Sequence, residues 1–226
     1  MSTKMLPIFL LCETPLHVGV GSDVGIVDLP IQRERHTGWP KIEASGVKGS
    51  IRNSFEMRYK GDYEKIRDVN VLFGYDDNGL DEKVKKYFGE DKDFSGSLGF
   101  TDARILLFPV KSLKGIFAWI TCPAVLDRFF SDLSIAGINV PKFKYKEKTI
   151  CPNSACLVNK SDGESKIILE EFTVSVNTDE ECGKLSEWLS EHIVPKGDFY
   201  EPLKEKLKKD LVILTDDLFT EFTALS

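Results

Sequence analysis

The chain has 226 residues, a mass of 25.5 kDa and 42% hydrophobic residues, which suffices for a hydrophobic core and excludes a disordered protein. Its formal net charge of −6 counts against a uniformly basic nucleic-acid binder, because lysine and arginine supply most of the affinity for phosphate. The apolar start is too short for a membrane span, and an odd number of cysteines, five, is typical of reduced thiols. We therefore expect a soluble cytoplasmic protein with no membrane partner.

The first predicted element is a buried strand between Pro7 and Thr14, which contains a short apolar run. A glycine-punctuated loop then covers residues 15–44. Ser45 is the predicted N-cap of a helix that ends near Tyr59 and buries residues at four-residue spacing, namely Val47, Ile51 and Phe55.

A second short helix is predicted over residues 63–73, because apolar side chains recur there at helical spacing. Residues 74–99 are polar and acidic and indicate an insertion or mobile loop. Two strands follow over residues 100–110 and 115–122, joined by a basic turn. Pro123 then suits the first position of another helix.

Residues 135–165 lack a clear period and are predicted to be an irregular insertion. Residues 166–176 alternate as one strand, with only Glu170 out of pattern. The remaining predicted elements are two helices near residues 180–192 and 199–209, a strand at 211–214 and a helix from Asp216. The last helix has an apolar stripe, from which we expect self-association or pairing with a partner subunit; the stripe consists of Leu218, Phe222 and Leu225.

Asp28 is the only carboxylate within residues 24–33, and His17 precedes it in a glycine-punctuated stretch. Lys48 and Arg52 follow one turn apart at the start of the predicted helix, where backbone amides and the helix dipole attract anions. An acid, an imidazole, flexible glycines and two cations so close together indicate a site that holds and cuts a phosphodiester backbone.

Asp28 has two interpretations. A loop Asp commonly caps a turn, here the turn before Pro30. Alternatively, its carboxylate acts on a ribose 2′-hydroxyl, as a general base or through bound Mg²⁺ or another divalent cation, and promotes attack on the adjacent phosphate. The other acid of this loop, Asp23, is interpreted as a turn residue.

The neighbouring residues also have a functional and a plainer interpretation. His17 either contacts RNA or shuttles a proton, or it is a hydrogen-bonded loop residue. Lys48 and Arg52 either bind phosphate or form a solvated helix face. The glycines do not match a nucleotide-binding loop, and Gly19 and Gly21 are more consistent with the close approach of an RNA backbone.

Four blocks of the sequence resemble, in the same order, the RAMP superfamily of CRISPR proteins. The closest resemblance is to the repeated backbone subunit of the type III-B (Cmr) RNA-guided effector complex. The blocks lie in the first half of the chain, which makes the resemblance specific, and they are Leu16–Ser22, Val24–Arg33, Ser45–Arg52 and Phe100–Gly115, the last continuing through Ala118–Pro123.

The order of predicted elements is that of an α+β, ferredoxin-like fold, and the resemblance implies an RRM-like palm with large insertions in one domain over residues 1–226. An antiparallel sheet of this kind leaves one face for RNA. Family chains continue past the helix in which this sequence ends, so we expect a truncated form.

The resemblance also implies roles for particular residues. The family uses an Asp at the position of Asp28 to cut target RNA, and a Lys at the position of Lys48 to bind guide RNA. Ser45 and Arg52 belong to the same block, whereas Arg104 and Lys111 belong to the last one, where contact with RNA and contact with a subunit are not distinguished.

The expected function is therefore that of an endoribonuclease within an assembled complex. Its expected partners are guide RNA, complementary single-stranded target RNA, copies of itself and other Cmr subunits. One alternative is a purely structural guide-binding subunit, in which Asp28 is dispensable. The other is a guide-processing ribonuclease of the same superfamily, which needs His17 as a base.

Overall fold

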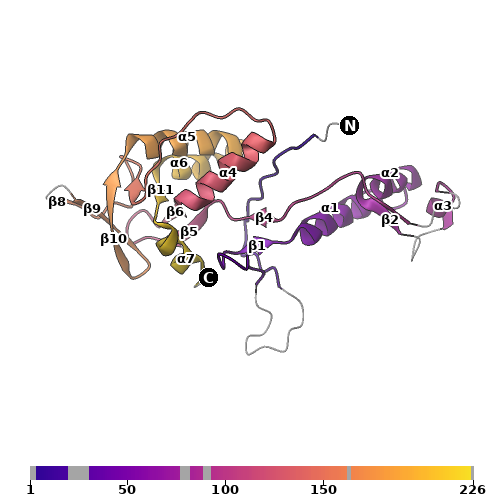
Figure 1. Ribbon diagram of the computed structural model, residues 1–226, viewed down its shortest axis with the longest axis horizontal. Coiled ribbons are helices and arrows are strands. Elements are labelled where there is room, and N and C mark those ends of the chain that lie inside the picture. Colours follow the sequence, from indigo (N-terminus) through magenta and orange to yellow (C-terminus); the bar gives the residue numbers. More distant parts are fainter. Residues whose placement is uncertain (1–3, 20–30, 77–81, 89–92, 162–163, 225–226) are drawn as a thin grey trace, which may run out of the picture. The chain divides into compact units, whose positions relative to one another are not determined.

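The computed structural model describes residues 4–19, 31–76, 82–88, 93–161 and 164–224. Contacts divide the chain into two compact units, which Figure 1 shows in chain colours. Unit 1 comprises residues 1–16, 34–40 and 105–226, and unit 2 comprises residues 17–33 and 41–104. Each unit has its own buried side chains. The prediction of one domain over residues 1–226 stays a prediction.

Unit 1 is built on a seven-stranded sheet in the order β5-β6-β11-β7-β10-β9-β8. Its strands are β5 (Phe108–Lys111), β6 (Phe117–Thr121), β7 (Thr149–Ile150), β8 (Asn159–Ser161), β9 (Glu164–Leu169), β10 (Phe172–Thr178) and β11 (Leu211–Ile213). The pairs β6–β11 and β7–β10 are parallel, and the other pairs are antiparallel. Parallel pairing is possible because long connections join these strands: the one from β6 to β11 contains helices, and the one from β7 to β10 contains β8 and β9. The α+β class is confirmed, whereas the prediction of a purely antiparallel sheet is wrong.

The helices of unit 1 lie close to their predicted positions and are α4 (Pro123–Ile135), α5 (Glu180–Ile193), the short 3-10 helix η1 (Asp198–Tyr200), α6 (Glu201–Lys209) and α7 (Asp216–Ala224). Pro123 begins α4 as predicted, because its missing N–H would have no partner there. Among the described residues, no helix is both long and apolar enough to cross a membrane.

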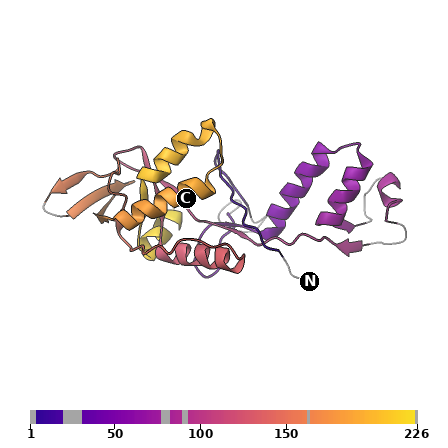
Figure 2. The same ribbon diagram turned by 90° about the horizontal axis from the view of Figure 1, so that it is seen from above.

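Both faces of the central sheet are covered by protein. Along β11 and the residue that follows it, Val212 and Leu214 belong to one core cluster, and Leu211 and Ile213 belong to the other. All four side chains are fully buried. The second cluster includes residues of α4, α5 and α6, and Figure 2 shows α5 and α6 lying together. The expectation that one sheet face is left open for RNA is therefore wrong for these strands.

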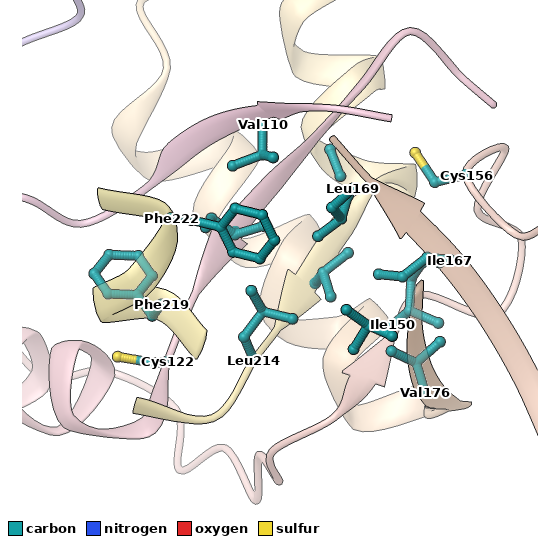
Figure 3. Close-up of a cluster of buried hydrophobic side chains, with 14 of the residues drawn as sticks. Val110, Cys122, Ile150, Cys156, Ile167, Leu169, Val176, Leu214, Phe219 and Phe222 are labelled. Atoms are coloured by element: carbon teal, nitrogen blue, oxygen red, sulfur yellow. The ribbon is translucent and has the colours of Figure 1, made fainter. Parts of the chain in front are cut away.

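The sheet also curls, so that β5 meets β9. The Leu113 N–H donates to the Ile168 carbonyl at 3.0 Å, and the Glu170 N–H donates to the Lys111 carbonyl at 2.9 Å. Figure 3 shows the enclosed core, in which side chains of several strands meet Phe219 and Phe222 of α7. Because Phe222 is buried and Leu225 lies outside the described residues, the stripe predicted to drive self-association is not exposed as expected.

Three other predictions for unit 1 are wrong. The predicted strand over residues 166–176 is a hairpin, and Glu170, the residue out of pattern, lies at its turn with φ +50°. Residues 135–165 include β7, whose two residues are buried in the sheet. Residues 7–14 form no strand and are mostly exposed, because no sheet edge pairs with them in the described chain.

Unit 2 contains α1 (Ala44–Arg58), α2 (Tyr63–Phe73), the short α3 (Glu82–Lys85) and two small sheets. One sheet pairs β1 (Lys41–Ile42) with β4 (Ala103–Arg104), and the other pairs β2 (Gly74–Asp76) with β3 (Asp93–Ser95). Figure 2 shows α1 and α2 side by side, as both helices were predicted. Val47 is buried, but Phe55 is exposed, so the predicted inner face of α1 is only partly right.

The acidic segment 74–99 is folded where it is described, rather than being a loop. Three of its aromatic rings form a cluster, with Tyr75 within 4.2 Å of Phe88 and 5.4 Å of Phe94 between ring centroids. Tyr75 and Val84 are almost fully buried. The acidic composition of the segment therefore belongs to its surface, while its aromatic residues supply a small core.

Candidate nucleic-acid interface

In unit 2, the described residues on either side of segment 20–30 are hydrogen-bonded to each other. Gly19 and Ile31 form an isolated antiparallel bridge. The Gln32 N–H donates to the Val18 carbonyl at 2.8 Å, and the Gln32 side-chain Nε2 donates to the Gly19 carbonyl at 3.2 Å. Both ends of the loop are thus fixed to each other by backbone and side-chain hydrogen bonds.

Gln32 also connects this loop base to the start of α1. Its carbonyl accepts from the Lys41 N–H at 3.0 Å, and its side-chain Oε1 accepts from the Glu43 N–H at 2.9 Å. One residue therefore takes part in four hydrogen bonds, two through its backbone and two through its amide. The amide joins Gly19 on one side to the residue before α1 on the other.

The N-terminus of α1 is capped by a carboxylate from a distant part of the chain. Asp102 accepts from the Ala44 N–H at 2.9 Å through Oδ1 and from the Lys41 ammonium at 2.9 Å through Oδ2. The hydrogen bond from Lys41, followed by that from Ala44, lowers the pKa of Asp102 below its ordinary value. Ser45 is exposed and is the second residue of α1, so its prediction as the N-cap is wrong: Glu43 occupies that position without a side-chain cap.

This cap changes what the start of α1 offers to an anion. A helix N-terminus attracts negative charge through its free N–H groups and its dipole. Here the Asp102 carboxylate already occupies the first of these N–H groups. The binding of an RNA phosphate near the start of α1 would therefore depend on cationic side chains more than on the first backbone N–H.

The two predicted cations of α1 have different surroundings. Lys48 is half-buried and forms no ion pair with any described residue. Arg52 donates to Glu56 Oε1 at 2.7 Å, to the Asn70 side chain at 2.9 Å and to the Gly74 carbonyl at 3.1 Å. Arg52 thus ties α1 to α2 and β2, and its role in RNA binding stays a prediction.

The structure describes only some of the residues predicted to take part in catalysis. His17 is exposed and makes no hydrogen bond or ion pair with the described residues. Asp28 and Gly21 lie outside the described residues, as does Asp23, the other acid of the same segment. Within the described ranges, no group of three or more His, Cys, Asp or Glu side chains could hold a metal ion, and the divalent cation predicted at Asp28 stays a prediction.

The cations of the last sequence block fall in different units. Arg104 is an exposed residue of β4, where it pairs with Lys41 across the small sheet of unit 2. Lys111 is an exposed residue at the end of β5 in unit 1. Unit 2 therefore brings together the predicted residues His17, Gly19, Ser45, Lys48, Arg52 and Arg104.

Sequence reasoning missed both Gln32 and Asp102. Neither residue stands out by periodicity, because the partners of their side chains lie 11 to 61 positions away in the chain. Asp102 does lie within the fourth sequence block, and Gln32 within the second, so the blocks themselves were the available signal.

Comparisons with known proteins agree with the predicted family. The model of the RAMP superfamily matches residues 9–223. The CRISPR system Cmr endoribonuclease Cmr4 of Pyrococcus furiosus is 35% identical over 225 residues, which cover 99% of this chain and 68% of that protein. The crystal structure of oligomeric Cmr4 from Pyrococcus furiosus superimposes with a TM-score of 0.67 at 31% identity, over 94% of this chain and 69% of that one.

A second crystal structure, of Pyrococcus furiosus Cmr4 (Cas7), gives a TM-score of 0.59 at 32% identity over 87% of this chain and 68% of that one. The similarity thus extends over nearly the whole chain in sequence and in fold, well beyond the four blocks. The chain belongs to the RAMP superfamily and, within it, to the Cmr4 family that its sequence resembles.

Proposed function

We propose that this chain is a backbone subunit of a type III-B CRISPR ribonucleoprotein, which holds guide RNA and cleaves complementary target RNA as an endoribonuclease. The observation that carries the proposal is the 35% identity to the Cmr endoribonuclease over 99% of the chain. In this function base pairing recognises the target sequence, while the protein holds the shape and phosphates of the RNA.

The geometry of unit 2 supports this function. The segment that contains Asp28 is flanked by Gly19 and Ile31, which form an antiparallel bridge with each other. Gln32 fixes that bridge to the start of α1, which presents Lys48 without an ion-pair partner among the described residues. The Gln32 side chain thus connects the start of the helix that carries Lys48 with the residues that flank the segment containing Asp28.

In the proposed reaction the 2′-oxygen of a target ribose attacks the adjacent phosphorus, and the bond to the 5′-oxygen of the next nucleotide breaks. Asp28 takes the 2′-hydroxyl proton as the general base. The products are a 2′,3′-cyclic phosphate and a 5′-hydroxyl, which gains a proton. His17 is the candidate that contacts the RNA or supplies this proton, because it is exposed and is located two residues before Gly19.

Mg²⁺ or another divalent cation bound at Asp28 would supply the same polarisation of the 2′-hydroxyl and stabilise the developing charge. No step above depends on it. We further propose that the protein acts in the cytoplasm, that copies of it stack along the guide with other Cmr subunits, and that part of its α+β fold corresponds to the RRM-like palm of the family.

The proposal is tested by assembling the complex with this chain and a guide, and then offering complementary and non-complementary target RNA. We expect cleavage of the complementary strand only. Precursor guide RNA offered to the isolated chain is the matched control, because its cleavage would indicate a guide-processing enzyme instead. Intact complementary RNA, bound but uncut under all metal conditions, would leave a purely structural subunit.

A further inference from the structure

A second basic surface lies in unit 1, outside the candidate interface. Residues 142–148 have the sequence Lys-Phe-Lys-Tyr-Lys-Glu-Lys, in which lysines alternate with two aromatic residues and one acid. The lysines are exposed, whereas Phe143 and Tyr145 are half-buried. Alternate exposure of this kind is what an extended chain produces when one side of it packs against the protein.

The aromatic side chains anchor the segment to the helices beneath it. Phe143 and Tyr145 both contact the ring of Phe130 on α4, with centroids 5.7 and 6.1 Å away, and Phe143 also lies 5.8 Å from Trp188 on α5. The Tyr145 hydroxyl donates to Asp127. Because both rings point to the same partner, the lysines on either side of them project away from the protein. Lys142, Lys144 and Lys146 form what we call the lysine ridge.

No ammonium group of the ridge forms an ion pair with a described carboxylate, in contrast to the lysines of the neighbouring helices. On α5 and α6, Lys184, Lys204, Lys206, Lys208 and Lys209 all form ion pairs with carboxylates. No described carboxylate lies within ion-pair distance of the ridge ammonium groups. Of the adjoining acids, Asp127 accepts from Tyr145, and Glu181 pairs with Lys184 at 2.7 Å. The backbone N–H and the charge of Lys144 also help to lower the pKa of Glu181, so Lys142 and Lys146 are the ridge lysines with the least internal compensation.

Lys148 is left out of the ridge. It lines a shallow depression together with Glu147, Asp216 and Asp217, so acidic side chains surround it. The ridge thus consists of three lysines, spaced two residues apart on an anchored extended segment. Such residues recur every ~6.6 Å, which is close to the separation of successive phosphates in an extended single strand of nucleic acid.

We propose that the lysine ridge is a second RNA-binding surface, which contacts successive phosphates of an extended single strand. This inference rests on the proposed function, because it takes RNA as the ligand of this chain. Anchoring by Phe143 and Tyr145 lowers the entropic cost of aligning the cations, and the absence of internal ion pairs leaves the ammonium groups available for phosphate. Contacts to phosphate carry no base information, so the surface is indifferent to sequence.

The test compares two double variants of the full chain that remove the same charge. Lys142→Ala with Lys146→Ala changes the ridge, and Lys208→Ala with Lys209→Ala changes two ion-paired lysines. Binding of a fluorescent single-stranded RNA 20-mer is measured over a salt series. In the ridge variant, the slope of log affinity against log salt should shrink by ~1.4, with affinity on the order of 10-fold weaker at 0.1 M salt. The control variant should bind like the wild type.

Three results would overturn the inference. Equal losses in both variants would indicate a general effect of net charge. If the ridge variant keeps the affinity and the salt slope of the wild type, the ridge is a solvated face. If the variant also loses self-association in sedimentation, the ridge is a protein-docking surface instead. If the wild-type chain does not bind RNA at all, both the RNA-binding role of the ridge and the RNA-binding part of the proposed function are refuted. The outcomes seen only in the variants leave the proposed function intact.

Discussion

Replacement of Gln32 by Ala is expected to loosen the base of the loop at residues 20–30 without unfolding unit 2. The change removes two side-chain hydrogen bonds, one to the Gly19 carbonyl and one from the Glu43 N–H, and it keeps both backbone hydrogen bonds of residue 32. A net contribution of ~1 kcal/mol for each bond gives a local loss of about 1–2 kcal/mol. This loss corresponds to a roughly 5- to 30-fold change in the local opening equilibrium.

Amide hydrogen exchange measures this change directly. In Gln32→Ala the Glu43 amide should exchange faster by that factor, while amides of α5 in unit 1 serve as an internal control. Gln32→Glu is the matched variant, because it keeps an oxygen to accept from the Glu43 N–H and loses only the donor to Gly19. In the proposed mechanism Asp28 acts from this loop, so target cleavage should fall in Gln32→Ala. Unchanged exchange at Glu43 would refute the role assigned to Gln32.

Three further changes have definite expected outcomes. Arg128→Ala should lower the free energy of unfolding by ~3 kcal/mol, because it removes the guanidinium 2.8 Å from the buried Glu34 carboxylate and leaves the Thr37 hydroxyl and the exposed His36 as its neighbours. Calorimetry that gives under ~1 kcal/mol would contradict this. Because the pKa of Asp102 is lowered in the folded protein, the hydrogen bond from Ala44 to Asp102 contributes its full stability above the ordinary pKa of 3.8. This contribution is lost as the pH falls through the lower folded pKa. Exchange of the Ala44 amide, corrected for its intrinsic pH dependence, should therefore accelerate only in acid. Lys48→Ala should reduce the salt slope of guide binding by ~0.7, and an unchanged slope would make Lys48 a solvated residue.

Local sequence patterns predicted most of the helices, because α2, α4 and α5 bury apolar residues at helical spacing. The pattern was weaker for α1, which buries only Val47, and it missed the short α3. The start of α4 at Pro123 and the position of α2 follow directly from such local signals. The hairpin at Glu170 was missed because apolar side chains on both faces of β9 allowed Ile168 to be read in phase with Val174 and Val176. In the structure the buried positions change parity across the turn, from Ile167 and Leu169 on β9 to Val174 and Val176 on β10.

Features that depend on distant residues could not be read from the sequence. The parallel pairing of β6 with β11 joins segments some ninety residues apart, and no period within either strand specifies its partner. The same limit applies to the site, where Asp102 caps a helix that begins 58 positions earlier. Resemblance located the residues of the candidate interface, whereas the structure revealed what holds them in place.

The alternation of lysine with aromatic residues at 142–148 was visible in the sequence, but the segment was predicted to be irregular. Its pattern is that of a strand, yet no strand partner exists for it among the described residues. Rings of α4 and α5 take the place of a neighbouring strand. The two-residue period of this segment therefore indicates that one side of it packs against the protein. It does not imply that the segment belongs to a sheet.

The central claim is that Asp28 performs the chemistry of target-RNA cleavage, and it is tested most directly by Asp28→Asn in the assembled complex. Guide and target binding are confirmed first, and cleavage is then timed with Mg²⁺ present, with Asp23→Asn as the matched control from the same loop. The account predicts that Asp28→Asn binds both RNAs and cuts ~10²-fold more slowly or not at all, because it lacks the general base, and that Asp23→Asn cuts normally. Wild-type cleavage by the Asp28→Asn complex would contradict the account.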